Sequence, residues 1–171
     1  MDQLKDYQNN YNPYYDLYLK NLNSLDSIQE RLVHNHKLIF NFFNEIEDEK
    51  YHYAYADDKW NIGQILQHII DTERIFCYRA LKIVREDKPI IKSYDHEDYA
   101  LNASFKSKQI HLEDYQNNRL ASLSLFKTFD EDDLKKSINF GSYKFSVGLI
   151  PFIFCGHELH HAKVIKSTYL K

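Results

Sequence analysis

The sequence predicts an all-α protein built as a bundle of four long helices. The 171 residues include four glycines and three prolines, too few turn-forming residues for a β-sandwich or a barrel. Four long stretches carry apolar residues at the spacing of an amphipathic helix. A hydrophobic content of 43% and an aromatic content of 15% are typical of a folded protein. By its length, the chain is expected to form a single domain over residues 1–171.

The chain is expected to open with an arm, followed by the first long helix. Residues 1–20 are polar and rich in tyrosine, which predicts an arm or a short helix that lays aromatic rings over the main body. The first long helix covers about 24–46, where apolar residues keep a helical period over about six turns. It begins near Ser24, or about a turn later at Ser27, because Ser27 and Glu30 have the spacing of a capping box.

The second long helix has the clearest start signal. Asn61 can cap it, and Gln64 at the third helical position can reach back to the cap. The segment 86–89 ends this helix with a proline. The connection over 89–108 is the longest in the chain, which predicts a crossover with a short helical turn in its acidic part.

A third helix over about 109–129 and a fourth near the C-terminus complete the bundle, with a hairpin between them. Apolar residues alternate over 137–145 around a two-residue Gly-Ser turn, which predicts a small β-hairpin. The fourth helix is expected to be capped by Ser146 or Gly148. With the earlier cap, Pro151 would remove a backbone hydrogen bond and kink the helix, and a later start avoids this cost.

The fourth predicted helix carries the strongest indication of function. His157 and His161 are four residues apart, so both imidazoles lie on one face of a helix, one turn apart. They fall in the middle of an apolar stripe. Its members are Ile150, Ile153, Phe154, Val164 and Ile165. Burying two unpaired imidazoles is costly, and a shared metal ion would satisfy both.

His68 is the expected third ligand. It lies on the shoulder of the apolar stripe of the second helix, beside Ile65 and Thr72, and Thr72 is a further candidate to line the site. A lone histidine there is more often a structural residue, but a buried His-x-x-x-His pair on another helix favours a role as ligand. Three neutral imidazoles from two helices would leave metal positions open for water or substrate, which is typical of a catalytic site.

Three further polar residues are candidates for the surroundings of the site. Glu73 lies at the centre of an apolar helix face, where a buried pair with Arg74, Arg79 or a tyrosine is expected. The functional alternative for Glu73 is an acceptor that orients a ligand histidine. His36 and His160 are expected to pack beside the site or to flank it.

The last motif also reads His-Glu-x-x-His, as in zinc metalloproteases, where the glutamate is the general base. A protease is disfavoured, because the rest of the chain has no matching signature for a third ligand. On the helix, Glu158 also turns about 100° away from His157, so it is expected to be solvated or to pair helices. Polar contexts predict that the remaining histidines of interest are solvated, namely His52, His96 and His111.

Charge and composition disfavour several classes of partner. The net charge is −3 without a basic tract, so neither nucleic-acid nor membrane-surface binding is expected. The longest apolar stretch, near 147–155, is too short to span a bilayer. A polar start without a signal peptide makes the cytoplasm the expected location. Cys77 and Cys155 lie in helical patterns and are expected to be small buried residues.

Two stretches of the chain resemble signatures of the DinB-like/YfiT-like superfamily. The first signature is a Trp-Ser-Ile-type helix start, then a histidine, then an Asp-x-Glu-Arg-x-x-x-Tyr-Arg run, and residues 59–81 are similar to it (KWNIGQILQHIIDTERIFCYRAL). The second is resembled by residues 156–161 (GHELHH), and the arm residues 12–15 (NPYY) are similar to those of some members. The resemblance covers nearly the whole chain.

The resemblance implies a four-helix bundle of up-down-down-up order, in agreement with the long connection before the third helix. It implies a divalent metal, usually Zn²⁺ or Ni²⁺, held by His68, His157 and His161, and imidazole ligands suit both metals. Homodimers are common in the family, so a homodimer is expected. Pro151 departs from the family pattern, because a plain helix former is usual at that position, but no ligand is missing.

The expected function is that of a metal-dependent enzyme acting on a small molecule. The family includes transferases of low-molecular-weight thiols, a mycothiol-dependent isomerase and members without a known activity. This implies a metal that activates a small thiol or water, in a thiol S-transferase or in a related hydrolase. One alternative is a non-catalytic metal-binding or stress-response protein. Another is a bundle in which the histidines only pack.

Overall fold

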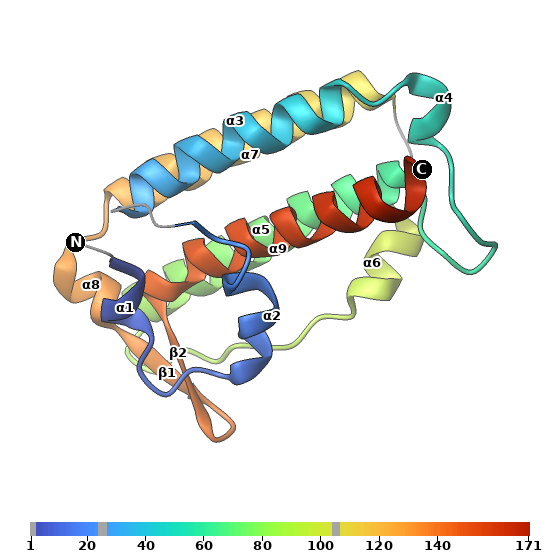
Figure 1. Cartoon of the computed structure of the whole chain (residues 1–171). Helices are drawn as coiled ribbons and strands as arrows, with labels where there is room; N and C mark the ends of the chain where they lie inside the picture. Colours follow the sequence, from blue (N-terminus) through green and yellow to red (C-terminus); the bar gives the residue numbers. More distant parts are fainter. Residues whose placement is uncertain (1–2, 24–26, 104–106) are drawn as a thin grey trace.

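Four long helices form the body of the protein in the computed structural model, which describes residues 3–23, 27–103 and 107–171 (Figure 1). Within these ranges the long helices are α3 (Ile28–Asn44), α5 (Ile62–Arg85), α7 (Lys108–Lys127) and α9 (Ile150–Val164). α3 packs against α7 and α9, and α5 packs against the same two helices. The all-α four-helix bundle predicted from the sequence is confirmed.

The four helices follow the predicted up-down-down-up order (Figure 1). α3 and α9 run in one direction along the bundle, and α5 and α7 run in the other. Because α5 and α7 are parallel, the chain has to return along the bundle between them, which explains the long connection. The returning chain leads to the short helix α6 (His96–Asn102), which packs against α5.

Two helix starts follow the capping signals of the sequence. Ser27 caps α3, and its Oγ accepts a hydrogen bond from the backbone N of Glu30 at 3.1 Å. The later of the two predicted starts is therefore correct, and Ser24 lies outside the described residues. At α5, the backbone N of Gln64 donates to Asn61 Oδ1 at 2.9 Å, and the backbone N of Asn61 donates to Gln64 Oε1 at 2.9 Å. These two bonds form the predicted capping box.

The predicted hairpin is also present. β1 (Ser137–Phe140) and β2 (Tyr143–Ser146) pair antiparallel across a two-residue turn. Gly141 in this turn has a φ of 63°, which lies in the left-handed region that glycine adopts without strain. A short helix that the sequence did not predict, α8 (Glu131–Lys135), leads into the hairpin.

Neither Ser146 nor Gly148 caps α9, so this prediction was wrong. A 3₁₀ turn, η2 (Val147–Leu149), leads directly into α9, and Ser146 stands before that turn without a capping hydrogen bond from its side chain. The later start places Pro151 in the first turn of α9, where its missing N–H costs no hydrogen bond. At its other end α9 continues into a π-helical turn, η3 (Ile165–Tyr169).

The arm, residues 3–22, lies over the bundle as predicted. Its short helices are α1 (Gln3–Tyr7), η1 (Pro13–Tyr15) and α2 (Asp16–Leu19). α2 packs against α9, and the contact is close at Gly156, where an added Cβ would lie 2.5 Å from the backbone oxygen of Tyr18. A glycine at this position therefore lets the backbone of the arm touch the helix that carries two of the histidines.

The burial of His111, at the end of the bundle near α4 (Asp48–Tyr51), differs from the sequence-based expectation. His111 was expected to be solvated, but its ring is 3% exposed and its Nδ1 lies 2.9 Å from Tyr51 Oη. Both cysteines were expected to be buried: Cys155 is fully buried, whereas Cys77 is half-buried, and both are free thiols. Among the helices of the described ranges, none combines the length and the apolar character that crossing a bilayer requires.

Candidate metal centre

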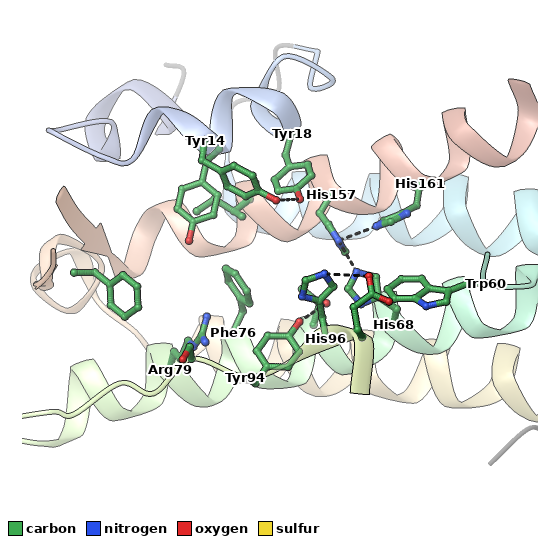
Figure 2. A pocket seen from close by; sticks show the side chains of 16 residues that line it. Tyr14, Tyr18, Trp60, His68, Phe76, Arg79, Tyr94, His96, His157 and His161 are labelled. Carbon is green, nitrogen blue, oxygen red and sulfur yellow. Dashed lines mark hydrogen bonds and ion pairs between the residues drawn. The ribbon is translucent and has the colours of Figure 1, made fainter. Parts of the chain in front are cut away.

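Three histidines from two helices come together inside the bundle (Figure 2). His68 lies on α5, and His157 and His161 lie one turn apart on α9. Nε2 of His157 lies 3.0 Å from Nε2 of His68 and 3.0 Å from Nε2 of His161. Candidate ligand atoms of the three side chains lie within 4.8 Å of one another. The structure thus brings together the three residues that the sequence predicted as ligands.

Burial keeps these imidazoles neutral. His68 is 6% exposed and His157 is 5% exposed. Desolvation by burial lowers the pKa of His68 to about 4 and the pKa of His161 to about 3. It also lowers the pKa of His157 well below its usual value. At neutral pH each ring therefore keeps one nitrogen with a free lone pair, which is the state that binds a metal ion.

Two of the separations between the nitrogen atoms are close to those around a divalent metal. Nitrogen ligands of a tetrahedral zinc ion, each about 2.0–2.1 Å from the metal, lie roughly 3.3 Å from one another. The two 3.0 Å separations between Nε2 atoms are close to that spacing. Imidazole nitrogens suit zinc and nickel alike. Three protein ligands also leave a coordination position open, as in catalytic rather than structural sites.

Aromatic rings position two of the three histidines. The ring centroid of Trp60 lies 4.9 Å from that of His68, and the ring centroid of Tyr18 lies 5.1 Å from that of His157, edge to face. Nδ1 of His157 is buried and has no hydrogen-bond partner among the described residues. The orientation of His157 is therefore set by packing rather than by a hydrogen bond to a carboxylate, the more common arrangement around metal ligands.

A buried ion network joins α5, α7 and α9 next to the histidines. Arg119 on α7 donates to both carboxylate oxygens of Glu73, at 2.8 and 3.0 Å, and to Oε2 of Glu158 at 2.7 Å. Glu73 forms the buried pair that the sequence predicted, but its partner is Arg119 and not Arg74 or Arg79. Because both oxygens of Glu73 face Arg119, Glu73 does not act as the acceptor that orients a ligand histidine.

Glu158 is part of this network and faces away from the three histidines. It is 1% exposed, so the expectation that it is solvated was wrong, and the alternative that it pairs helices is correct. Tyr115 Oη donates to Glu158 Oε2 at 2.9 Å. Burial raises the pKa of the Glu158 carboxyl group. Glu158 does not line the pocket beside the histidines, so the general base of a metalloprotease is missing from its expected place.

A pocket of about 430 Å³ lies beside the three histidines (Figure 2). Its walls are mainly aromatic and come from the arm, from α5 and its N-terminal flank, from the connection before α6, and from the hairpin. The aromatic lining residues are Tyr14, Tyr15, Tyr18, Trp60, Phe76, Tyr94 and Phe140. In Figure 2 the histidines occupy one end of the pocket, Arg79 lies at the other end, and Phe76 and Tyr94 lie between them.

The other predicted candidates divide between the pocket and the packing around it. Thr72 lines the pocket, and its Oγ1 lies 2.8 Å from Tyr94 Oη. His36 does not line the pocket, and its ring stacks on Tyr115 with centroids 5.7 Å apart. His160 is half-buried and flanks the site, since its ring centroid lies 5.7 Å from that of Tyr18, but it does not line the pocket either.

Sequence reasoning missed several lining residues, and His96 and Trp60 are the two in contact with His68. His96 was expected to be solvated, and it is exposed, but its ring centroid lies 5.8 Å from that of His68 and it lines the pocket. It reaches the site because α6 folds back onto α5, which no local pattern reveals. Trp60 stands directly before the cap of α5. Its place in the first signature motif was a signal that could have identified it.

The relatives found by comparison with known proteins share one descriptive name. A protein from Geobacillus thermodenitrificans named "Putative metal-dependent hydrolase" is 25% identical over 126 residues, 71% of each chain. Two proteins from Oceanobacillus iheyensis with the same descriptive name are 23% and 27% identical, over 77% and 72% of each chain.

A solved structure has the same fold. It is that of YfiT from Bacillus subtilis, described as "a probable metal-dependent hydrolase with an unusual four-helix bundle topology". The similarity has a TM-score of 0.66 at 15% identity and covers 94% of this chain and 89% of that one. The family model of the DinB superfamily matches residues 31–165, which contain all three histidines. With most of its length matched by that model, the chain belongs to the DinB superfamily.

Proposed function

We propose that this protein is a divalent-metal-dependent enzyme whose metal is held by His68, His157 and His161. The observation that carries the proposal is the convergence of three neutral imidazoles, two of them buried and that of His161 half-buried, at the wall of a pocket. A structural metal would be enclosed by a fourth protein ligand. In the ranges that the structure describes, no further histidine, cysteine or carboxylate joins this cluster. The names of the relatives, metal-dependent hydrolases, support the same conclusion.

A divalent metal bound here would lower the pKa of a coordinated water or thiol and so supply a nucleophile at neutral pH. The chain itself contributes neutral ligands, since burial keeps His68 and His161 unprotonated. Its aromatic walls would bind the organic part of a substrate and exclude bulk water from the reacting group. The paired hydroxyl groups of Thr72 and Tyr94 provide hydrogen-bonding groups in the same pocket.

The nucleophile is either water or the thiol of a small molecule. A protein thiol is disfavoured, because neither Cys77 nor Cys155 lines the pocket. Burial also raises the pKa of Cys77 to about 12 and the pKa of Cys155 well above its usual value. The names of the relatives favour hydrolysis by water, and the expected thiol S-transferase would use a low-molecular-weight thiol as its second substrate.

The first experiment measures bound metal in the purified protein without a tag. After incubation with zinc or with nickel, elemental analysis should give about one metal ion per chain. His68→Ala and His157→Ala should each lose it. His34→Ala is the matched control, because His34 is exposed on α3 and outside the cluster. Circular dichroism would establish that each variant is folded, and light scattering would test the predicted homodimer.

The second experiment separates the classes of function. The metal-loaded protein is incubated with a panel of esters and amides, and separately with small thiols and a reactive electrophile. Turnover that His157→Ala abolishes would support an enzyme, and the panel that reacts would distinguish hydrolase from transferase. Full metal occupancy without turnover in either panel would favour the non-catalytic metal-binding alternative. Failure of the wild-type protein to bind either metal would refute the proposed site.

A further inference from the structure

Arg79 lines the pocket, and in the part of the chain that the structure describes its charged neighbours include no carboxylate. Its Nη2 donates to the backbone oxygen of Lys92 at 2.9 Å, whereas its Nε is buried without a hydrogen-bond partner. Its guanidinium carbon lies 5.1 Å from the ring centroid of Phe76 and 5.7 Å from that of Tyr94. Glu97, an acidic residue that also lines the pocket, is not paired with Arg79. A guanidinium group held between two aromatic rings is suited to bind an anion.

The position of Arg79 on α5 makes the pocket long. His68, Thr72, Phe76 and Arg79 follow one another at intervals of four, four and three residues, and all of them line the pocket. Eleven residues make about three helical turns, so His68 and Arg79 lie on the same face, roughly 16 Å apart along the helix axis. The pocket therefore has the metal site at one end, a cation at the other and an aromatic middle (Figure 2).

We propose that Arg79 binds an oxyanion, a carboxylate or a phosphate, at the end of the substrate remote from the bond that reacts. This inference rests on the proposed function, because it assumes that the reaction takes place at the metal held by the histidines. It identifies the substrate class as an elongated organic anion. The reactive group would lie at the histidines, and an apolar or aromatic segment would lie against Phe76 and Tyr94.

The surroundings of Arg79 favour this role. Desolvation lowers the pKa of the Arg79 guanidinium, although an arginine remains protonated at any physiological pH. A cation that has lost part of its hydration without gaining a carboxylate is stabilised when an anion binds. Charge-assisted hydrogen bonds from its remaining N–H groups further favour a carboxylate or a phosphate over a neutral acceptor.

A structural role is the competing explanation. The hydrogen bond to the backbone of Lys92 ties the chain before α6 to α5 and could serve only to place Tyr94 in the pocket wall. Loss of a merely structural Arg79 would weaken charged and neutral ligands alike. Loss of an anion-binding Arg79 would weaken charged ligands selectively. The ratio of the two affinities is therefore the quantity to measure.

The first test uses metal-free protein, so that it does not depend on the histidine site. Octanoate, octyl phosphate and the neutral octanamide are titrated, and binding is followed by protein-observed NMR. Charge-assisted hydrogen bonds predict that at least one of the two anions binds about 10- to 100-fold more tightly than the amide. The anion that binds more tightly identifies the oxyanion as carboxylate or phosphate.

Variants of arginines on the same helix provide the controls. The anion preference is the affinity for the anion divided by the affinity for the amide. Arg79→Gln should reduce this ratio to nearly one, and Arg79→Lys should retain part of it because the charge remains. Arg74→Gln should leave the preference unchanged, since Arg74 is exposed, pairs with Asp114 at the surface and does not line the pocket. An anion preference that persists in Arg79→Gln, or its absence from the wild type, would overturn the inference.

The second test links the two ends of the pocket. Zinc-loaded protein is titrated calorimetrically with hydroxamic acids, which chelate the metal, over three chain lengths with and without a terminal carboxylate. At the chain length that spans the distance from the metal to Arg79, the terminal carboxylate should tighten binding about 10-fold or more in the wild type and not in Arg79→Gln. Hydroxamates that bind without any carboxylate effect would refute the two-ended substrate and leave the metal site intact. Hydroxamates that fail to bind would count against the metal site, while the metal-free titration decides the role of Arg79 independently.

Discussion

Replacing Arg119 by methionine should destabilise the protein severely. Arg119 is 0% exposed and donates to Glu73, Glu158 and the backbone oxygen of Leu32. Methionine has a similar volume and no charge, so Arg119→Met leaves two carboxylates buried without a cation. Those carboxylates belong to α5 and α9, the two helices that carry the histidines.

The expected loss can be estimated from the burial of the network. Removing one partner of a buried ion pair costs about 3–5 kcal/mol, because the charge left behind is neither solvated nor paired. This is a large share of the roughly 5–15 kcal/mol that stabilises a typical domain. For a chain of this length, about 2–4 °C is lost per kcal/mol, so the melting temperature should fall by roughly 6–20 °C.

Urea denaturation followed by circular dichroism would measure this loss. Arg74→Met is the matched control and should cost under about 1 kcal/mol, because its ion pair is at the surface. Adding Glu73→Gln and Glu158→Gln to Arg119→Met should restore much of the stability. Unpaired buried carboxylates bind protons more readily when folded than when unfolded, so the deficit of Arg119→Met should shrink from pH 7 to pH 5. A loss below about 1 kcal/mol that does not change with pH would refute this reasoning.

Two further predictions concern the histidine site and the arm. In metal-free protein, the pKa values of about 4 for His68 and about 3 for His161 lie below the usual 6.5. Below pH 6.5 the unfolded chain therefore binds more protons than the folded chain, so the urea midpoint of unfolding should fall between pH 7 and pH 5. The fall should be smaller in His68→Gln. A urea midpoint that does not change with pH would contradict this prediction. Gly156→Ala should lower the melting temperature by an amount equivalent to about 1–3 kcal/mol, because the new Cβ would lie 2.5 Å from the Tyr18 oxygen. An unchanged or raised melting temperature would show that the arm shifts away from the new methyl group without a loss of stability.

Most predictions from local patterns are confirmed, with the cap of α9 as an exception. The capping box at Asn61 and the start of α3 at Ser27 depend on residues three positions apart, and the hairpin depends on one turn. The i, i+4 pair on α9 is local in the same sense. Such features follow from spacing and side-chain chemistry alone, and they gave the bundle and two of the three clustered histidines.

Apart from the cap of α9 and the short helix α8, the errors concern partners that lie far apart in the sequence. Arg119 is 46 positions from Glu73, and α7 buries this arginine although its own pattern is largely polar. His111 was misplaced for the same reason, because its partner Tyr51 is 60 positions away. His96 reaches the pocket only through the return of the chain to α6. A single sequence identifies a buried polar residue from its place in a helix, but it does not name the residue that satisfies it.

Under the proposed function, the residues that bind the metal and the residues that select the substrate belong to different parts of the chain. The three histidines lie within residues 31–165, the part matched by the family model, whereas Tyr14, Tyr15 and Tyr18 precede it. These tyrosines form one wall of the pocket, so substitutions in the arm can change which molecules fit without touching a ligand nitrogen. Relatives that share the histidines but carry different arms should then act on different substrates. The arm is accordingly the segment to exchange between relatives when a new specificity is sought.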